Sequence, residues 1–339
     1  MRKFVQNYSP SVLPAMQAPP STIIITSCTN RKKELGDVVR LHVVDAVTSV
    51  EALARIWIAR VNAVQRREPV RSLYQGRAFS EAKLAADAAG ATLYVASAGH
   101  GLVNCEVLLP SYDLTVVAAP GNPLHAMLTR LHKTPADWWQ ALTACFEASR
   151  SLVTLLNSHA SKNCIVVLAM SSTYLAMLQD DLAGLNEHQI SRLRIITSEF
   201  GVSKLPEHIR KMALPYDERL EGSVSYTGTR SDFAQRALRH FMVELRGHEL
   251  PMSIARQGVI SAMEALVRRS PPQRERKSDE AIEALIFQSW DYCRGSQSAL
   301  LRWLRDQQLV SCEQSRFRLL WQRVQLKMTV ASRGNNGKA

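Results

Sequence analysis

A cysteine with cations close behind it is the most reactive feature of the sequence. Cys28 follows an apolar, strand-like run at Ile23–Ile25, and Asn30, Arg31 and Lys32 come soon after it. Positive charge beside a thiol favours the thiolate, which is the nucleophilic form. A basic turn that precedes a helix can also hold an anion. The segment predicts a nucleophilic cysteine or, alternatively, a buried thiol at the end of a strand.

A second strand-like run, Leu93–Ala96, also ends in residues that can do chemistry. Ser97 follows it, and His100 stands between two glycines, where the backbone can approach a ligand closely. The turn-forming run Pro110–Thr115 contains Asp113, which is either an acid/base group or the polar residue of an Asx turn. We expect His100 and Asp113 to lie side by side.

Further polar and aromatic side chains are expected to line the same cleft as candidates for substrate binding. Tyr74 can stack on a base or simply pack. Serines and a tyrosine end a third strand in the way that His100 ends the second. The set comprises Tyr74, Ser97, Tyr112 and Ser171, with Ser172 and Tyr174 beside the last of these.

Composition indicates a folded protein with a basic surplus. The chain has 339 residues, enough for two domains, with 46% hydrophobic and 21% charged residues. Its formal net charge is +12 and its pI is about 9.7. Such a surplus favours a polyanionic partner, most often nucleic acid. The alternative is a basic protein that binds no such partner.

Several classes of protein are disfavoured. The six cysteines are far apart and form no Cys-x-x-Cys pair, which argues against a zinc ribbon and a disulfide framework, and Cys145 and Cys164 lie in apolar runs typical of a core. The motifs of phosphate loops, dinucleotide-binding turns and zinc proteases are missing, so we expect no cofactor and no metal. Without an evident signal peptide or membrane span, we expect a cytoplasmic protein with no membrane partner.

Strands and helices alternate along the first two thirds of the chain. This order predicts an α/β fold, with a largely parallel sheet that carries helices on both faces. The expected strands are 23–25, 93–96, 164–170 and 194–197, and the expected helices are 37–68, 80–89, 137–156 and one that runs from the Ser171 segment towards 182.

The remainder of the chain predicts a basic, all-α tail. Its expected helices are 231–245, 253–268, 280–293, 298–306 and 312–324. The last two flank a turn and fit a helix-turn-helix. The predicted organisation is a flexible arm (1–20), an α/β catalytic domain (21–228), a helical extension (229–269), a linker (270–279) and a basic helical subdomain (280–330).

Charge in this tail predicts contacts with DNA. From Leu250 onward, 15 Lys and Arg residues stand against 8 Asp and Glu, a difference of +7. The candidate DNA-binding residues are Arg302, Arg305, Arg316 and Arg323. The alternative is a helical subdomain that docks on the sheet or on a partner protein. Elsewhere, an ion pair between Arg219 and Asp232 is a further expectation.

Several short motifs resemble those of the YaaA-like family. They are Leu73-Tyr-Gln-Gly, the run Leu93–Val103, Pro110-Ser-Tyr-Asp-Leu and the later Val167–Tyr174. The opening Ser27–Lys33 instead resembles the Cys-Ser-x-Lys-Lys turn of the archaeosine synthase core, which acts on a nitrile-bearing 7-deazaguanine. The likeness covers about residues 21–200.

The resemblance implies an enzyme of the bacterial DNA 7-deazaguanine modification system, whose YaaA-like member converts inserted 7-cyano-7-deazaguanine to the amide. Cys28 would be the nucleophile, His100 or Asp113 the proton carrier, and Arg31 with Lys32 would hold phosphate or developing charge. The implied partners are DNA and the other enzymes of the modification cluster, in a setting of phage defence. The Cys28 segment and the basic tail depart from plain YaaA proteins and favour the modification enzyme.

Two other functions stay open. One is a DNA-binding stress or regulatory protein without catalysis, in which the α/β domain senses a nucleotide-like ligand. The other is a base or nucleoside glycosidase with an acidic catalytic residue such as Asp113.

Overall fold

The computed structural model describes residues 21–43, 46–147, 150–159, 164–268 and 272–335. The chain divides into two compact units, Met1–Arg269 and Ser270–Ala339. Each unit has its own cluster of buried hydrophobic residues. The expected flexible arm, 1–20, lies outside the described residues.

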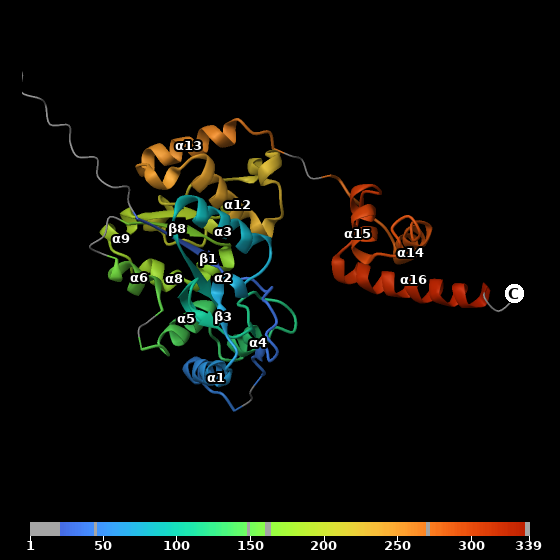
Figure 1. Cartoon of the computed structure of the whole chain (residues 1–339), viewed down its shortest axis with the longest axis horizontal. Helices are drawn as coiled ribbons and strands as arrows, with labels where there is room; N and C mark the ends of the chain where they lie inside the picture. The colour runs from blue at the N-terminus through green and yellow to red at the C-terminus, as the bar shows by residue number, and fades with distance from the viewer. Residues whose placement is uncertain (1–20, 44–45, 148–149, 160–163, 269–271, 336–339) are drawn as a thin grey trace, which may run out of the picture. The chain divides into compact units, whose positions relative to one another are not determined.

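A five-stranded sheet forms the centre of the first unit (Figure 1). Its strand order is β5-β4-β1-β8-β9, and the neighbours among β4, β1, β8 and β9 are parallel. The bounds are β1 (Ser21–Ser27), β4 (Thr92–Ser97), β5 (Gly101–Asn104), β8 (Cys164–Ala169) and β9 (Leu193–Ile196). The expected α/β fold with a largely parallel sheet is confirmed. The antiparallel strand β5 was not predicted, because a glycine-bounded run of four residues is too short to show a periodicity.

The central position of β1 explains its composition. Ile23, Ile24 and Ile25 are at most 3% exposed, as expected for a strand covered on both faces. The register places Ser27 opposite Ala96 of β4. The carboxyl ends of these parallel strands therefore meet at one edge, and Cys28 lies there.

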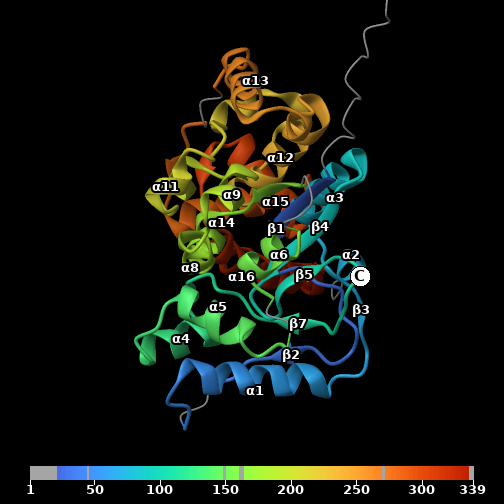
Figure 2. The same cartoon turned by 90° about the vertical axis from the view of Figure 1, so that its left-hand side faces the viewer.

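Helices flank the sheet (Figure 1). On one side α3 (Arg77–Ala89) packs against α12 (Phe233–Arg239), and on the other α5 (Pro135–Thr143) packs against α1 (Val50–Ala63) and α7 (Ser172–Met177). In Figure 2, α1 runs along the base of this unit beneath the short β2–β7 pair.

The helical extension is built into the first unit. Gln235 of α12 donates to the Thr26 hydroxyl at 3.0 Å and to the Ala169 carbonyl oxygen at 3.1 Å, which fixes α12 over β1 and β8. The expected Arg219–Asp232 pair is wrong. Arg219 pairs with its near neighbour Asp217, and Asp232 instead accepts from Arg236 at 2.6 Å.

Two expected helices have different bounds for a local reason. The helix expected at 37–68 begins only at Val50, because the Ser49 hydroxyl accepts from the Ala52 N–H at 3.2 Å and caps the first turn. Val43, which lies within the expected range, precedes the helix and is exposed. The helix expected at 137–156 is two helices, because Ser151 caps a separate helix in the same way.

The other elements of the first unit are short. They are β2 (Val39–Arg40), β3 (Glu68–Pro69), α2 (Val70–Leu73), β6 (Leu108–Leu109), β7 (Tyr112–Asp113), α4 (Pro123–Arg130), α6 (Leu152–Ser158), α8 (Gln179–Ala183), α9 (Glu187–Ser191), α10 (Glu199–Val202), α11 (Glu207–Arg210), α13 (Met252–Glu264) and single turns at Glu218–Gly222, Val224–Tyr226, Arg230–Asp232, His240–Glu244 and Gly247–Glu249.

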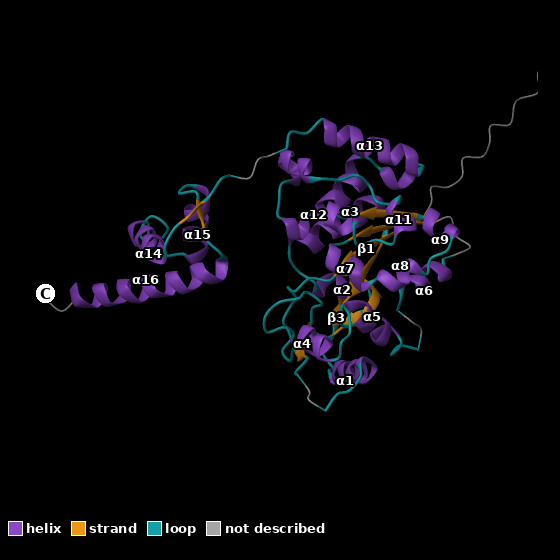
Figure 3. Cartoon of the chain, turned by 180° about the vertical axis from the view of Figure 1, so that it is seen from behind, coloured by secondary structure: helices purple, strands orange, loops and turns teal. Residues whose placement is uncertain are grey.

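The second unit is mainly helical, as the purple ribbon of Figure 3 shows, but it is not all-α. It contains β10 (Glu275–Arg276), α14 (Asp279–Gln288), α15 (Gln297–Asp306), β11 (Val310–Ser311) and α16 (Gln314–Asn335). β10 and β11 pair in parallel, a contact that two-residue segments are too short to reveal in sequence. α15 ends at Asp306 as expected, but α16 begins at Gln314 rather than at 312, and β11 lies within the link between the two helices. In the described part of the chain, every helix is too short or too polar to cross a membrane.

Candidate functional site

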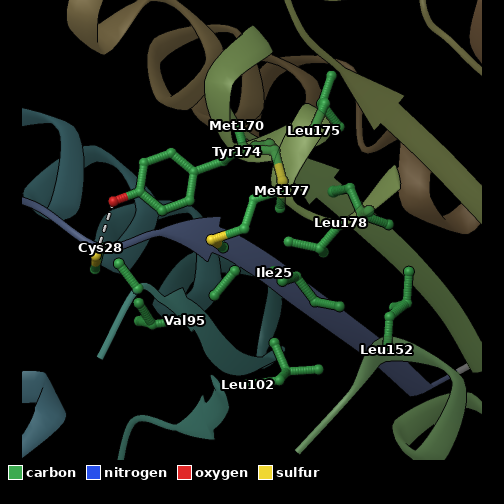
Figure 4. Packing of buried hydrophobic residues seen from close by; sticks show 14 of the residues in the cluster. Ile25, Cys28, Val95, Leu102, Leu152, Met170, Tyr174, Leu175, Met177 and Leu178 are labelled. Atoms are coloured by element: carbon green, nitrogen blue, oxygen red, sulfur yellow. Dashed lines mark hydrogen bonds between the residues drawn. The ribbon is translucent and has the colours of Figure 1, made fainter. Parts of the chain in front are cut away.

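A buried thiol and a buried phenol meet at the carboxyl edge of the sheet. The Sγ of Cys28, directly after β1, lies 2.9 Å from the hydroxyl of Tyr174 in α7, and either group can be the donor (Figure 4). Cys28 is 6% exposed and Tyr174 is 5% exposed. Parallel pairing of β1 with β8 brings the two together, because α7 starts where β8 ends.

The loop after Cys28 is fastened to the turn that contains Tyr74. Lys32 and Tyr74 form an isolated antiparallel β-bridge, and the Gln75 N–H donates to the Arg31 carbonyl oxygen at 2.9 Å. The loop after Cys28 and the turn that contains Tyr74, which are far apart in the sequence, are therefore held side by side.

A chain of hydroxyl groups extends the site. The Tyr112 hydroxyl lies 2.7 Å from Ser97 Oγ and 2.5 Å from the Tyr74 hydroxyl. Ser97 Oγ also accepts from the Gly99 N–H at 3.2 Å. The backbone N–H of Gly99 thus anchors one end of this chain of hydroxyl groups. Each phenol in it can donate or accept a hydrogen bond.

Lys32 brings a cation to these aromatic rings. Its Nζ donates to the Thr29 carbonyl oxygen at 2.8 Å and lies 4.1 Å from the centre of the Tyr112 ring. Burial lowers the pKa of Lys32, and the charges of Cys28 and Asp113 oppose that shift. Lys32 is therefore close enough to Cys28 to act on it electrostatically, and it releases a proton more readily than a surface lysine.

The phenols around the thiol stay protonated. Burial, and then the nearby Cys28, raise the pKa values of Tyr74, Tyr112 and Tyr174 well above their ordinary value. At neutral pH each ring therefore presents an O–H group rather than a phenolate. Such groups can hydrogen-bond an anionic sulfur or a nitrogen that gains negative charge.

The turn that precedes His100 is held by two tryptophans. Trp57 donates to the Gly99 carbonyl oxygen at 2.7 Å, and Trp138 donates to the Ala98 carbonyl oxygen at 2.8 Å. A Cβ atom at Gly99 would lie 2.9 Å from the Tyr112 ring, so only glycine allows this packing.

His100, the expected proton carrier, is buried beside the hydroxyl chain. It is 1% exposed, its ring packs edge-on against Tyr112, and its Nε2 has no hydrogen-bond partner among the described residues. Burial, followed by the charges of Arg150, Arg67 and Lys32, lowers its pKa to about 3. The imidazole is neutral at ordinary pH and is a weak base.

The other candidate residues lie on the surface. The Asp113 side chain is 68% exposed and lies 3.9 Å from Arg40, so it is not beside His100 in a buried pair. Asn30, Arg31 and Ser171 are exposed. The structure gathers the site around Cys28 with Lys32, Ser97, Tyr74 and Tyr112 and leaves the acidic candidate on the surface.

Sequence reasoning gave Tyr174 no more weight than the serines before it. The sequence does contain a signal for Tyr174, which is its distance from the end of β8. A side chain about one helical turn after the strand points back towards the neighbouring strand. Gln235, from a distant helix, reaches the same edge and lies 3.4 Å from Ser27 Oγ. No local pattern in the sequence indicates that contact.

The other cysteines are buried or partly buried. Burial raises the pKa of Cys105 to about 12 and also raises the pKa of Cys145, Cys293 and Cys312. These thiols are poor nucleophiles. Among the residues that the structure describes, no group of three or more His, Cys, Asp or Glu side chains could hold a metal ion.

The candidate DNA contacts of the tail differ in availability. Arg316 pairs with Asp279 at 2.5 Å, and Arg323 lies 3.3 Å from Glu283. Arg305 donates to the Cys312 carbonyl oxygen. Arg302 is exposed and has no hydrogen bond or ion pair within the described residues.

Comparisons of the chain with models of protein families, with curated proteins and with solved structures find no match.

Proposed function

We propose that this protein hydrates a nitrile carried by a 7-deazaguanine base in DNA, with Cys28 as the nucleophile. The observation that carries the proposal is the 2.9 Å contact between Cys28 Sγ and the Tyr174 hydroxyl at the end of the central strand. Carboxyl ends of parallel strands are where α/β folds place ligands. The resemblance to the YaaA-like family and to the archaeosine synthase core supports the choice of substrate.

The reaction balances without a cofactor. The Cys28 sulfur adds to the nitrile carbon, and the nitrile nitrogen takes up a proton to give a thioimidate. Water then adds to the same carbon, and the C–S bond breaks to release the amide and the thiol. Nitrile and water are consumed in equal amounts, and no electrons are exchanged.

Neighbouring groups fit the proton transfers of these steps. Lys32, with its lowered pKa, can give a proton to the nitrile nitrogen and later take one from water. The Tyr174 O–H can hydrogen-bond the sulfur as it gains and loses charge. Lys32 thus takes the place of His100 and Asp113 as the proposed proton carrier, and Tyr174 serves as a hydrogen-bond donor to the sulfur.

Aromatic rings pack edge-on against one another near the thiol. The ring centres of Tyr74 and Tyr112 are 6.4 Å apart, and Phe79 packs edge-on against Tyr74. Because Cys28 is buried, a base can reach it only if the loop after β1 moves and the base leaves its stack. The net charge of +12 supports DNA as the carrier of that base.

The test is a digest of treated DNA. DNA that contains 7-cyano-7-deazaguanine is incubated with the full chain, digested to nucleosides and analysed by mass spectrometry. We expect the nitrile nucleoside to gain one water. Unchanged nitrile alongside retained DNA binding would favour the DNA-binding protein without catalysis, and release of free base would favour the glycosidase.

A further inference from the structure

The second unit has a hollow of about 410 Å³ with basic walls. Arg274, Arg302 and Arg305 line it, and Asp306 is the one carboxylate among its lining residues. The remaining lining residues are Gln297, Ser298, Leu301 and Gln314. The hollow thus combines three guanidinium groups with neutral donors.

One face of α15 forms a wall of the hollow. Ser298, Leu301, Arg302 and Arg305 recur at the spacing of a single helical face. Leu301 is half-buried, whereas its neighbour Leu300 is 1% exposed. The first residues of α15 also border the hollow, and the unpaired N–H groups of a first turn carry partial positive charge.

Two of the three arginines are held in place by neighbouring groups. Arg274 donates to Asp306 at 3.0 Å and to the Arg305 carbonyl oxygen at 2.9 Å. Arg305 donates to the Cys312 carbonyl oxygen from both Nε, at 3.1 Å, and Nη2, at 2.6 Å. These bonds join the segment before β10, α15 and the segment after β11 into one wall.

Arg302 is the available cation of the hollow. It is exposed, and in the described part of the chain it has no hydrogen-bond or ion-pair partner. Arg316 and Arg323, which the sequence placed on equal terms with it, lie against Asp279 and Glu283. A guanidinium without a carboxylate partner keeps its full capacity for a bidentate contact with phosphate.

We propose that this hollow binds a phosphate of a nucleic-acid backbone, with Arg302 as the main contact and Arg274 and Arg305 beside it. The proposal rests on the proposed function, in which DNA carries the reacting base. It confines the phosphate contact of the tail to the hollow beside one face of α15. Contacts of this kind position DNA and do not read its sequence.

The test is a binding isotherm of the full chain with a short fluorescent duplex that carries no modified base, repeated over a series of salt concentrations. We expect Arg302→Ala to weaken binding about tenfold at low salt. We also expect it to reduce the slope of log affinity against log salt by about one unit. Arg302→Lys should keep the slope and lose part of the affinity, because it retains the charge without the planar fork.

Arg318→Ala is the matched control. Arg318 is exposed on α16 and also has no ion-pair partner among the described residues, but it does not line the hollow. We expect this variant to bind like the wild type. Equal weakening by Arg318→Ala, or unaltered binding by Arg302→Ala, would overturn the proposal.

The remaining outcomes identify what occupies the hollow. Direct binding of inorganic phosphate by the wild type that is lost in Arg302→Ala, together with no duplex binding, would mark a site for a free anion and overturn the proposal. An absence of both duplex and phosphate binding by the wild type would overturn the proposal and favour a protein partner as the occupant. Because the duplex carries no nitrile, its binding is measured without any reaction. A failure of nitrile hydration can therefore be distinguished from a failure of DNA binding at this hollow.

Discussion

Cys28 and Tyr174 are 146 positions apart in the chain, and their sulfur and hydroxyl oxygen are 2.9 Å apart in the fold. The contact depends on two neighbouring parallel strands that end at the same edge, one followed by the thiol and the other by a helix whose first turn carries the phenol. A structural thiol needs no such partner. The predictions below ask whether this pair and its surroundings do chemistry.

Replacement of Tyr174 by Phe should separate catalysis from stability. The ring keeps its packing, and the loss of one buried hydrogen bond should lower the free energy of unfolding by about 1 kcal/mol. Turnover should fall by about a hundredfold if the hydroxyl stabilises the reacting sulfur. Steady-state rates and urea unfolding measure the two effects. Wild-type turnover in a folded Tyr174→Phe variant would remove the phenol from the mechanism.

Lys32 should set the alkaline limb of the pH–rate profile. Its pKa lies below the ordinary lysine value because of burial, so the ammonium form is lost at a lower pH than for a surface lysine. If the ammonium gives the proton to the nitrile nitrogen, the rate falls as pH rises through that pKa. Lys32→Arg keeps the charge at all accessible pH values, so its profile should lack this limb. An unchanged limb in that variant would assign it to another group.

His100 should weaken the fold in acid. Its folded pKa of about 3 lies below the ordinary value of 6.5, so between these pH values the unfolded chain binds a proton that the folded chain does not. Stability is therefore lost as pH falls from 6.5 towards 3, by about 1.4 kcal/mol per pH unit from this residue. His100→Phe should flatten the dependence by that amount, measured by urea unfolding at several pH values. Parallel curves for wild type and variant would contradict the burial of a neutral imidazole.

Gly99 should tolerate no side chain. A Cβ atom there would lie 2.9 Å from the Tyr112 ring and 3.0 Å from the Trp57 ring, both fully buried. Gly99→Ala should cost about 1–3 kcal/mol in stability and disturb the Tyr112 hydroxyl chain. Gly258→Ala is the control, because a Cβ on that helical glycine meets nothing within 4 Å and should stabilise by up to about 1 kcal/mol. Thermal denaturation compares them, and equal melting temperatures would contradict the close packing at Gly99.

Much of the fold could be predicted because its signals are local. The run Ile23–Ile25 has the apolar composition of a strand buried on both faces, and the alternation with helices indicates parallel pairing. Cys28 and His100 stand out because each follows such a run. Helix bounds were less accurate where apolar residues continued the helical spacing beyond a capping serine, as they do before Ser49.

The chemistry of the site depended on contacts that no local pattern reports. His100 between two glycines indicates a ligand as readily as it indicates the close packing that the structure shows, since both require a small neighbour. Asp113 follows Tyr112 in β7, and consecutive strand residues point to opposite faces, so one is buried and the other exposed. In the tail, the partners of Arg316 and Arg323 come from α14, which sequence periodicity cannot pair with them.

The most direct test of the central claim is the capture of the covalent intermediate on Cys28. The full chain is mixed with an oligonucleotide that carries 7-cyano-7-deazaguanine, quenched in acid, digested and examined by peptide mass spectrometry. We predict a substrate adduct on the Cys28 peptide, amide formation by wild type and by the matched control Cys145→Ser, and loss of both adduct and amide in Cys28→Ser. Amide formation by Cys28→Ser at the wild-type rate would contradict the account and make Cys28 a structural thiol.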